Sequence, residues 1–352
     1  MSNKDFDGGL IDIASLNRNE MAALIGEFGE PRFRAGQVWR WVAGGAKSFG
    51  DMQNLPKALR EKLTERAFLY TSKLLQRQTS ADGTEKLLWE LIDGETVECV
   101  VMSYKHGNTV CISTQVGCRM GCAFCASTVG GLVRNLTAAE MVSEVRMSGE
   151  ATGKPISNVV LMGIGEPLDN FENVLRFLEI IDDVDGLNIG MRHISLSTCG
   201  IPGGIEKLAE RDLQITLSVS LHAPDDATRT RLMPVNKSMG VRPLIKQCEE
   251  YRKKTGRRMS YEYLLADGVN DSDAQAAELA SLLWRSDAHV NLIPLNLVDG
   301  APLKPSVPER VKSFVKILES RGVNVTVRRR MGDDIDAACG QLRRRKSSDG
   351  RG

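Results

Sequence analysis

The feature that most constrains this chain is an alternation of strand-like and helix-like segments between residues 106 and 327. Strands rich in β-branched and apolar residues are expected at 109–115, 158–163, 193–197, 213–220, 260–265, 290–294 and 323–327. Helices are expected between them at 137–148, 170–182, 204–210, 242–253, 271–284 and 308–321, and Pro224 is expected at the first position of another helix. Six or more βα units in sequence imply parallel strands.

Such an alternation predicts an α/β fold, namely a partial (β/α)6 barrel. A doubly wound open sheet is the competing fold. The first strand is not followed by a Gly-x-Gly-x-x-Gly phosphate loop, which weakens that alternative. A barrel presents its ligand-binding groups at the C-terminal ends of its strands.

Two smaller regions precede the barrel. Helical spacing at 17–28, 37–42 and 56–67 predicts an N-terminal helical domain over residues 1–72. Strands at 74–78, 85–91 and 96–104, separated by Gly-containing turns, predict a β-meander extension over 73–105. The barrel then occupies 106–322 and a C-terminal segment 323–352.

The net charge of +1 conceals an uneven distribution. Residues 71–320 carry 27 basic and 32 acidic side chains, whereas residues 321–352 carry 9 basic and 4 acidic ones. The basic clusters 328–330 and 343–346 suit phosphate contacts, although a solvated tail would have the same composition. No run of about 18 apolar residues and no secretory signal is found, so a cytoplasmic protein without a membrane partner is expected.

Eight cysteines in a reducing compartment favour metal binding or catalysis over a disulfide scaffold. Cys118, Cys122 and Cys125 follow the first barrel strand with the spacing C-x3-C-x2-C. Structural zinc would need a fourth ligand, usually from a second pair of cysteines, and none is found. A 4Fe–4S cluster normally binds four cysteines, so three would leave one iron open to another ligand. Zinc binding and redox sensing are the alternatives.

The spacing, with Phe124 just before the third cysteine, resembles the signature of the radical S-adenosylmethionine (SAM) superfamily. This resemblance implies a 4Fe–4S cluster held by Cys118, Cys122 and Cys125. Its open iron binds the amino and carboxylate groups of SAM, which is then cleaved to a 5′-deoxyadenosyl radical. The superfamily fold is a partial or full (β/α) barrel, which agrees with the alternation.

The segment 163–167, Gly-Ile-Gly-Glu-Pro, resembles the superfamily's Gly-Glu-Pro element, which meets the SAM amino group. Without the resemblance it would be an ordinary strand-to-helix turn, and His222 would be a structural histidine. With it, the residues implied to bind SAM follow predicted strands: Gly165, Glu166, Ser197, Ser220, Leu221, His222 and Asn296.

Glu98, Cys111 and Cys339, together with the segment 33–37, resemble the radical SAM RNA methyltransferase family of RlmN and Cfr over essentially the whole chain. The resemblance implies methylation of carbon 2 of an adenosine in the peptidyl-transferase region of 23S rRNA. It also implies methylation of the adenosine 3′ to the anticodon in tRNA. Cys339 would carry the methyl group. Cys111 would release the product from Cys339 by forming a transient disulfide with it, and Glu98 would accept the proton from the adenine ring.

Two SAM molecules per turnover, a reductant such as flavodoxin or ferredoxin, and a monomeric enzyme are expected. Cfr-like methylation of adenine carbon 8 is the nearest alternative. A non-catalytic, metal-stabilised RNA-binding protein would leave Glu98 and Cys111 without a role. A radical SAM enzyme of a small molecule would leave the helical domain and the basic C-terminal arm without one. Cys99, Cys199 and Cys248 are interpreted as small apolar fillers.

Overall fold

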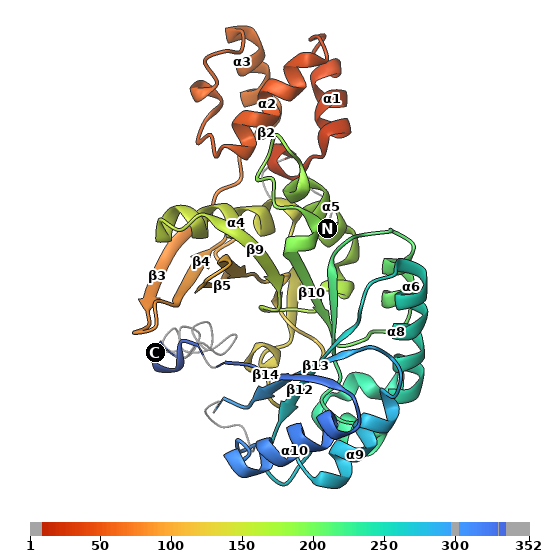
Figure 1. The fold of residues 1–352 in the computed structure, drawn as a ribbon. Helices are drawn as coiled ribbons and strands as arrows, with labels where there is room; N and C mark the ends of the chain where they lie inside the picture. The colour runs from red at the N-terminus through yellow and green to blue at the C-terminus, as the bar shows by residue number, and fades with distance from the viewer. Residues whose placement is uncertain (1–8, 297–302, 330, 336–352) are drawn as a thin grey trace.

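A ten-stranded sheet curves around a central cavity, with helices on its outer face (Figure 1). The structure is a computed structural model that describes residues 9–296, 303–329 and 331–335. The strand order is β14-β13-β12-β11-β10-β9-β6-β5-β4-β3. From β6 onward this order follows the chain, without the reversal that a doubly wound sheet requires. The predicted α/β class with a partial (β/α)6 barrel is confirmed.

The barrel half of the sheet is parallel. Its strands are β6 (Gly107–Cys111), β9 (Ile156–Leu161), β10 (Ile194–Thr198), β11 (Thr216–Ser220), β12 (Ser260–Leu265), β13 (His289–Pro294) and β14 (Asn324–Val327). The helices on the outside are α4 (Ala138–Thr152), α5 (Phe171–Asp182), α6 (Gly204–Ala209), α8 (Val241–Thr255), α9 (Asp273–Leu282) and α10 (Pro308–Ser320). The strand that ends at Val327 pairs with β13, so the barrel sheet continues past the boundary expected at residue 322.

The remaining three strands continue the same sheet in antiparallel register. They are β3 (Lys73–Thr79), β4 (Glu85–Glu90) and β5 (Thr96–Tyr104), and β5 pairs with β6. The β-meander is therefore an extension of the barrel wall. Within the described chain, the two outermost strands, β14 and β3, are not paired with each other, so the barrel is open on one side.

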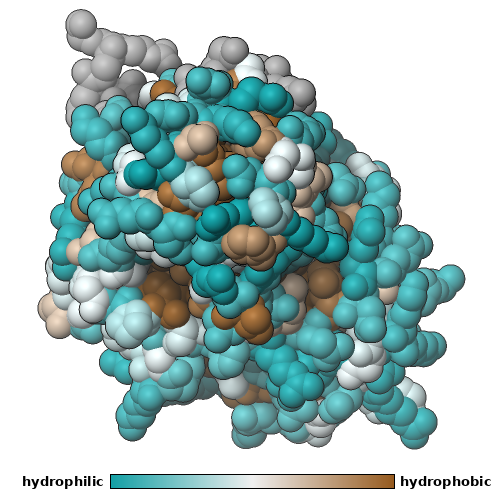
Figure 2. All heavy atoms as spheres, turned by 90° about the horizontal axis from the view of Figure 1, so that it is seen from above, coloured by the Kyte–Doolittle hydropathy of each residue, from teal (hydrophilic) through white to brown (hydrophobic). Residues whose placement is uncertain are grey.

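The N-terminal helices stand on the outside of the barrel near α4 and α5 (Figure 1). They are α1 (Arg18–Glu27), α2 (Phe33–Ala43) and α3 (Lys57–Arg66), flanked by the short parallel pair β1 (Ile11–Asp12) and β2 (Ala67–Phe68). Arg18 joins this domain to the barrel because its guanidinium donates to the carboxylate of Asp183 at 2.5 and 2.7 Å. The face seen from above is mostly hydrophilic, with apolar side chains in small separate patches (Figure 2).

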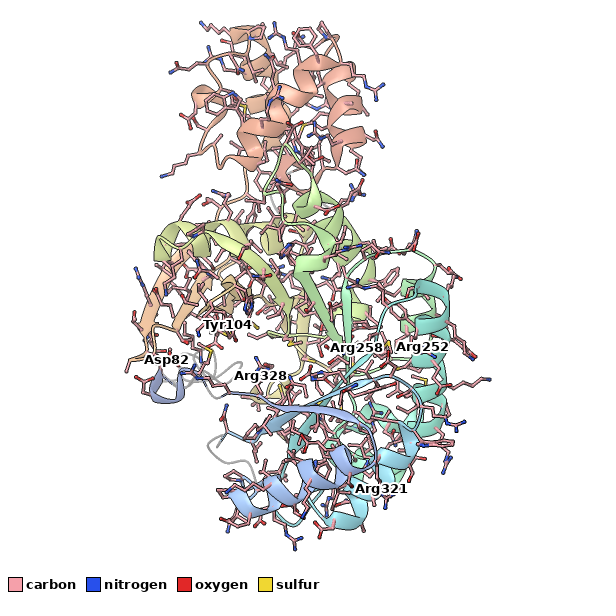
Figure 3. The ribbon with its side chains drawn as sticks, viewed as in Figure 1. Asp82, Tyr104, Arg252, Arg258, Arg321 and Arg328 are labelled. Carbon is pink, nitrogen blue, oxygen red and sulfur yellow. The ribbon has the colours of Figure 1, made fainter. Side chains whose placement is uncertain are left out.

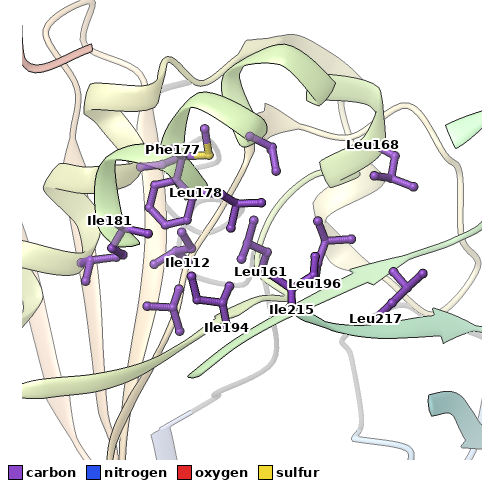
Figure 4. Packing of buried hydrophobic residues seen from close by; sticks show 14 of the residues in the cluster. Ile112, Leu161, Leu168, Phe177, Leu178, Ile181, Ile194, Leu196, Ile215 and Leu217 are labelled. Atoms are coloured by element: carbon purple, nitrogen blue, oxygen red, sulfur yellow. The ribbon is translucent and has the colours of Figure 1, made fainter. Parts of the chain in front are cut away.

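Helix α5 forms because its sequence places apolar side chains on one face, which packs against the sheet. The buried side chains of α5, Val174, Phe177, Leu178 and Ile181, recur three and four residues apart along the helix. Figure 4 shows this face packed over strand residues such as Leu161 and Leu196. Burial of a phenylalanine at such a position stabilises the fold by about 3–5 kcal/mol relative to alanine.

Two local predictions are wrong. Pro224 does not begin a helix, because α7 (Asp226–Leu232) starts after the N-cap Asp225, whose carboxylate accepts the Thr228 N–H at 2.7 Å. The strand expected at 109–115 is divided: β6 ends at Cys111, and Gln115–Gly117 forms β7, which pairs with β8 (Leu132–Asn135). The first prediction is wrong because the Asp225 side chain caps a helix that begins after it, so Pro224 lies before the helix. The second is wrong because residues 115–117 pair with β8 in a separate hairpin, which encloses the cysteine loop. No helix in the described chain is long and apolar enough to span a membrane.

Candidate active site

A cavity of about 350 Å³ opens at the C-terminal ends of the barrel strands. This size is in the range of small-molecule sites. Most of the expected site residues line it: Cys111, Cys118, Cys122, Cys125, Gly165, Glu166, Ser197, Ser220, His222 and Asn296. Leu221 is fully buried behind the wall, and Glu98 lies beside the lining. Cys339 lies outside the described residues.

The three clustered cysteines lie on the loop enclosed by the β7–β8 hairpin. Backbone hydrogen bonds fix this loop: the Cys118 N–H donates to the Gly131 carbonyl at 3.1 Å, and the Ala123 N–H donates to the Leu232 carbonyl at 2.9 Å. Burial, aided by the charge of the neighbouring Cys125, raises the pKa of the Cys118 thiol to about 11. Burial also raises the pKa of Cys122, with the other two thiolates adding to the effect.

This donor set fits an iron–sulfur cluster. Within the described chain, no three His, Cys, Asp or Glu side chains are grouped as ligands of a single metal ion. The three cysteines border one hollow, and the negative charges of their thiolate forms repel one another. Iron bound there would neutralise these charges and so stabilise the thiolates. The buried Ser127 hydroxyl lines the same hollow and has no hydrogen-bond partner in the described structure, which leaves a polar contact open to a ligand.

The Gly163–Pro167 loop crosses very close to the strand that precedes the cysteines. A Cβ on Gly163 would lie 2.5 Å from the Ile112 carbonyl oxygen. Gly165 has a φ of +109°, and a Cβ there would lie 2.6 Å from the Cβ of Gln115. Only glycine fits at these two positions. The Gln115 side chain completes the contact because its Oε1 accepts the Glu166 N–H at 2.9 Å.

The Glu166 carboxylate is engaged within the protein. One oxygen accepts the Leu168 N–H at 3.0 Å and the Thr198 hydroxyl at 2.7 Å, and the other accepts the Cys199 N–H at 2.7 Å. Burial raises the pKa of Glu166, and these hydrogen bonds oppose that rise. The side chain therefore ties the Gly-Glu-Pro loop to the end of β10, and the backbone of the loop faces the cavity.

Arg229 holds the neighbouring strand ends in the same way. Its fully buried guanidinium donates to the carbonyls of Cys199, Ser220 and Leu221 at 2.7, 3.1 and 3.1 Å, and to Asn236 Oδ1 at 2.9 Å. Sequence reasoning missed Arg229, since a charged residue on a short helix gives no sign of burial. It fixes the backbone on which the expected SAM-binding residues stand.

His222 is held as a neutral side chain. Its Nδ1 accepts the Leu264 N–H at 3.0 Å, so the proton of the neutral ring resides on Nε2. Burial, aided by the charge of Arg229, lowers the pKa of His222 to about 3. Its φ of +58° is rare for a non-glycine residue, and the Phe124 ring packs edge-on against it at 4.8 Å. At neutral pH His222 can donate a hydrogen bond but carries no charge.

The opposite wall of the cavity comes from the antiparallel strands. Cys111 pairs with Val100 of β5, which pairs with Lys86 of β4, so these residues form one row across the sheet. Glu98 is two residues from Val100 and thus shares its face. Glu98 Oε1 lies 3.6 Å from the Lys86 ammonium, and both side chains are buried. Sequence reasoning missed Lys86 because no motif contains it.

Cys111 is a free, buried thiol. Burial raises its pKa to about 11, and the charge of Arg328 and the Met162 N–H oppose that rise. The seven cysteines in the described chain are free thiols, and Cys339, the expected disulfide partner of Cys111, lies outside the described residues. Cys111 thus lines the cavity that the cysteine loop borders, and Glu98 lies on the adjacent strand, on the same face of the sheet and beside the lining.

Comparison with known proteins identifies both parts of the chain. Residues 112–280 match the Radical SAM superfamily, and residues 11–69 match the ribosomal RNA large subunit methyltransferase N-terminal domain. A protein of Desulforamulus reducens named "Probable dual-specificity RNA methyltransferase RlmN" is 51% identical over 340 residues, which cover 96% of this chain and 97% of that protein. A protein of the same name from Symbiobacterium thermophilum is 51% identical over 95% of this chain and 91% of its own length.

A solved structure agrees with this assignment. The crystal structure of a radical SAM methyltransferase from Sphaerobacter thermophilus is 43% identical, superposes with a TM-score of 0.88, and covers 94% of this chain and 98% of that one. Sequence, domain order and fold therefore agree over nearly the whole length. The chain belongs to the RlmN family of radical SAM RNA methyltransferases.

Proposed function

We propose that this enzyme methylates carbon 2 of adenosine in 23S rRNA and in tRNA, with Cys339 as the methyl carrier. The name of its relatives, dual-specificity RNA methyltransferase, supports two kinds of RNA substrate. The observation that carries the proposal is the placement of Glu98 and Cys111 on adjacent strands. Cys111 lines the cavity that the three-cysteine loop borders, and Glu98 lies on the same face of the sheet beside that lining.

Cys118, Cys122 and Cys125 would hold the 4Fe–4S cluster. Gly165, Ser197, Ser220, His222 and Asn296 would contact SAM around it, with Glu166 and Leu221 contributing through the backbone they fix. With electrons from a donor such as flavodoxin or ferredoxin, the cluster supplies the 5′-deoxyadenosyl radical that removes one hydrogen atom from a methyl group.

The chain's own residues perform the transfer. Carbon 2 of adenine is electrophilic and cannot attack a sulfonium methyl group directly, so the Cys339 thiolate first takes a methyl group from one SAM. A second SAM would be consumed when a hydrogen atom leaves that S-methyl group, and the methylene carbon would then add to carbon 2 of adenine. The adduct radical would give up one electron, for which a bound oxidised cluster is the acceptor, and Glu98 would accept the carbon 2 proton. The Cys111 thiolate would attack the Cys339 sulfur, which breaks the bond from sulfur to the methylene carbon. That carbon would take up a proton to become the methyl group, and the Cys111–Cys339 disulfide would be left for an external reductant.

The N-terminal helical domain and the basic C-terminal residues would bind the RNA backbone. Arg34, Arg40, Lys57 and Arg60 lie on α2 and α3, and Arg328 and Arg329 line the cavity mouth. A structured adenosine must leave its stack to reach the cavity, which costs a few kcal/mol, and phosphate contacts offset this. Removal of residues 1–72 is expected to weaken RNA binding and to flatten its salt dependence.

The direct test is anaerobic reconstitution with iron, sulfide, SAM and a reductant. A 23S rRNA fragment or tRNA is then added, digested and analysed by mass spectrometry. We expect 2-methyladenosine, a methylated Cys339 peptide, and no product from the Cys339→Ala variant. Formation of 8-methyladenosine without 2-methyladenosine would show that the enzyme methylates carbon 8, as expected for a Cfr-like enzyme. A methylated product from Cys339→Ala would overturn the role of the carrier.

A further inference from the structure

The open side of the barrel is crossed by the residues that follow β14. We call the described residues 328, 329 and 331–335 the C-terminal strap. Arg328, Arg329 and Met331 of the strap line the cavity, and the strap ends against the turn that joins β3 and β4. In Figure 3, Arg328 lies at the start of the strap and Asp82 lies at its far end. The strap thereby links the two strand edges that do not pair with each other.

Two carboxylates make this contact, one from each side. The Asp334 carboxylate accepts the Ser80 hydroxyl and the Ala81 N–H, the latter at 3.0 Å. In the opposite direction, Asp82 Oδ2 accepts the Gly332 N–H at 3.0 Å, and its Oδ1 accepts the Thr84 N–H at 2.9 Å. These hydrogen bonds lower the pKa of both carboxyls, so each is charged at neutral pH and each contact is charge-assisted.

We propose that the turn 80–84 is the docking site of the C-terminal strap and that Asp82 and Asp334 are positioning residues for the methyl carrier. The inference rests on the proposed role of Cys339. Ile335 is the last described residue before Cys339, four positions further along the chain. Thr84, at the end of the docking turn, lines the same cavity as Cys111.

The number of residues between the docked strap and Cys339 determines how strongly docking raises the local concentration of the Cys339 thiol at the cavity. Four residues span at most about 14 Å, so an anchored strap holds Cys339 within that distance of Ile335. Without the anchor, the last fixed contact is the Arg328 N–H on the Leu292 carbonyl, and the eleven residues from there to Cys339 span up to about 40 Å. The local concentration of the Cys339 thiol at the cavity then falls about 5-fold for a flexible chain and ~20-fold by accessible volume.

The contact is placed where it adds little to the fold itself. The two carboxylates of the contact, Asp82 and Asp334, are exposed, their partners Ser80 and Gly332 are buried, and the turn lies at the end of an edge hairpin. Loss of the contact should therefore leave the sheet, the cysteine loop and the SAM-binding strands intact. A positioning role and a stabilising role can be separated by experiment.

The main variant is Asp334→Ala, with Ser80→Ala and the double variant completing a cycle. Full release of the strap would slow methylation of Cys339 and formation of RNA product by about 5- to 20-fold. Asp334→Ala keeps the contact of Asp82 with the Gly332 N–H, so we expect a slowing between about 2-fold and about 20-fold, with the KM for SAM, the iron content and the thermal midpoint unchanged. The double variant should be no slower than Asp334→Ala, because both changes remove one contact. Hydrogen exchange at Gly332 should accelerate in all three.

Asp93→Asn is the matched control. Asp93 accepts the Glu95 N–H at 3.1 Å in the next hairpin turn, as Asp82 does for Thr84. It also accepts Arg134 Nε at 2.7 Å, for which the asparagine amide keeps an acceptor oxygen, and its hydrogen bonds include no described residue of the strap. It should leave the Cys339 methylation rate within 2-fold of the parent.

Two results would overturn the docking role: a wild-type rate of Cys339 methylation in Asp334→Ala, or a rate loss explained by lost iron or lower stability. If the parent enzyme makes no methyl-Cys339, the proposed function fails instead. In that case unchanged exchange at Gly332 in Asp334→Ala would also reject the docking contact.

Discussion

The two walls of the cavity are built on different principles. The parallel wall, made of β9–β12 and the Gly163–Pro167 loop, holds its polar groups by internal hydrogen bonds, as Glu166 and Arg229 show. The antiparallel wall, made of β3–β5, carries the buried Lys86–Glu98 pair and receives the C-terminal strap on its turn. The polar groups of the parallel wall are thus held by neighbours within that wall, whereas the turn of the antiparallel wall also receives a segment from the far end of the chain.

This difference matches the division of labour in the proposed reaction. A cofactor that is bound the same way in every cycle benefits from rigid groups, because preorganised dipoles need no rearrangement. A carrier that must meet SAM, RNA and Cys111 in turn needs a tether that restricts it without fixing it. Substitutions in either wall, and at the place where the two walls meet, test this difference.

The largest effect is expected from the cysteine loop. Cys122→Ala should lose the iron–sulfur cluster and all RNA methylation, while hydrogen exchange at Gly332 on the other wall stays unchanged. Iron and sulfide analysis, together with the absorbance of the reconstituted protein, checks the first part. Cys248→Ala on the outer helix α8 is the control and should retain its iron. An unchanged iron and sulfide content in Cys122→Ala would show that this loop does not supply the cluster ligands.

Glu98→Gln should separate the two walls most clearly. Loss of a positioned base typically costs 10²–10⁴ in rate, so RNA product should fall by that factor. Methylation of Cys339 should continue, because methyl transfer from SAM to a thiolate does not require the base that accepts the carbon 2 proton. Single-turnover assays of both products provide the measurement. Glu90→Gln on the neighbouring β4, outside the cavity lining, is the control and should change neither product more than 2-fold. Equal loss of both products would contradict the assignment.

Arg229→Met should weaken the parallel wall. The substitution leaves the carbonyls of Cys199, Ser220 and Leu221 buried without a donor, so a loss of about 3–5 kcal/mol in the free energy of unfolding is expected. Urea unfolding measures it. Arg231→Met on the exposed side of the same helix should change stability by less than about 0.5 kcal/mol. Comparable effects of the two substitutions would show that the buried contacts contribute little.

The smallest effect concerns Glu144, which lies behind the sheet where the two walls meet. Its Oε2 accepts the Ser113 N–H at 3.0 Å and the Cys99 thiol at 2.7 Å, and burial raises its pKa to about 8. The folded protein therefore holds a proton that the unfolded chain releases near pH 4.5. Stability should fall as the pH rises between these values, by about 1 kcal/mol from pH 7 to pH 8.

Urea unfolding at several pH values tests this, with Glu144→Gln as the comparison. The amide keeps an acceptor for the Ser113 N–H but cannot ionise, so the fall between pH 7 and pH 8 should shrink in the variant. An equally steep pH dependence in both proteins would assign it to another group.

The sequence reveals much of the parallel wall and less of the antiparallel one. Periodicity locates the barrel strands and helices, and the spacing of Cys118, Cys122 and Cys125 points to the metal loop, since both signals are local. Arg229 and Lys86 escape such reasoning because burial of a charge depends on partners elsewhere in the chain. The pairing of Asp82 with Gly332 joins residues 250 positions apart, and no local pattern contains it.

The wrong position of Pro224 has a local cause. Proline is suited to the first turn of a helix, but Asp225 directly after it offers a side-chain cap, and the helix begins behind that cap. The divided strand at 109–115 has a tertiary cause. The same β-branched run serves two sheets, and only the pairing of Gln115–Gly117 with Leu132–Asn135 reveals the break.

The two unpaired edges of the sheet also set an order of folding. The docking turn and the strap are separated by some 250 residues, and the chain between them forms almost the whole sheet. Closing so long a loop in an unfolded chain is entropically costly, whereas a folded sheet already brings β14 and β3 to the same opening. The strap therefore docks late in folding and is among the first parts to open. The described strap, which precedes Cys339 in the chain, reaches its turn only after the cavity has formed.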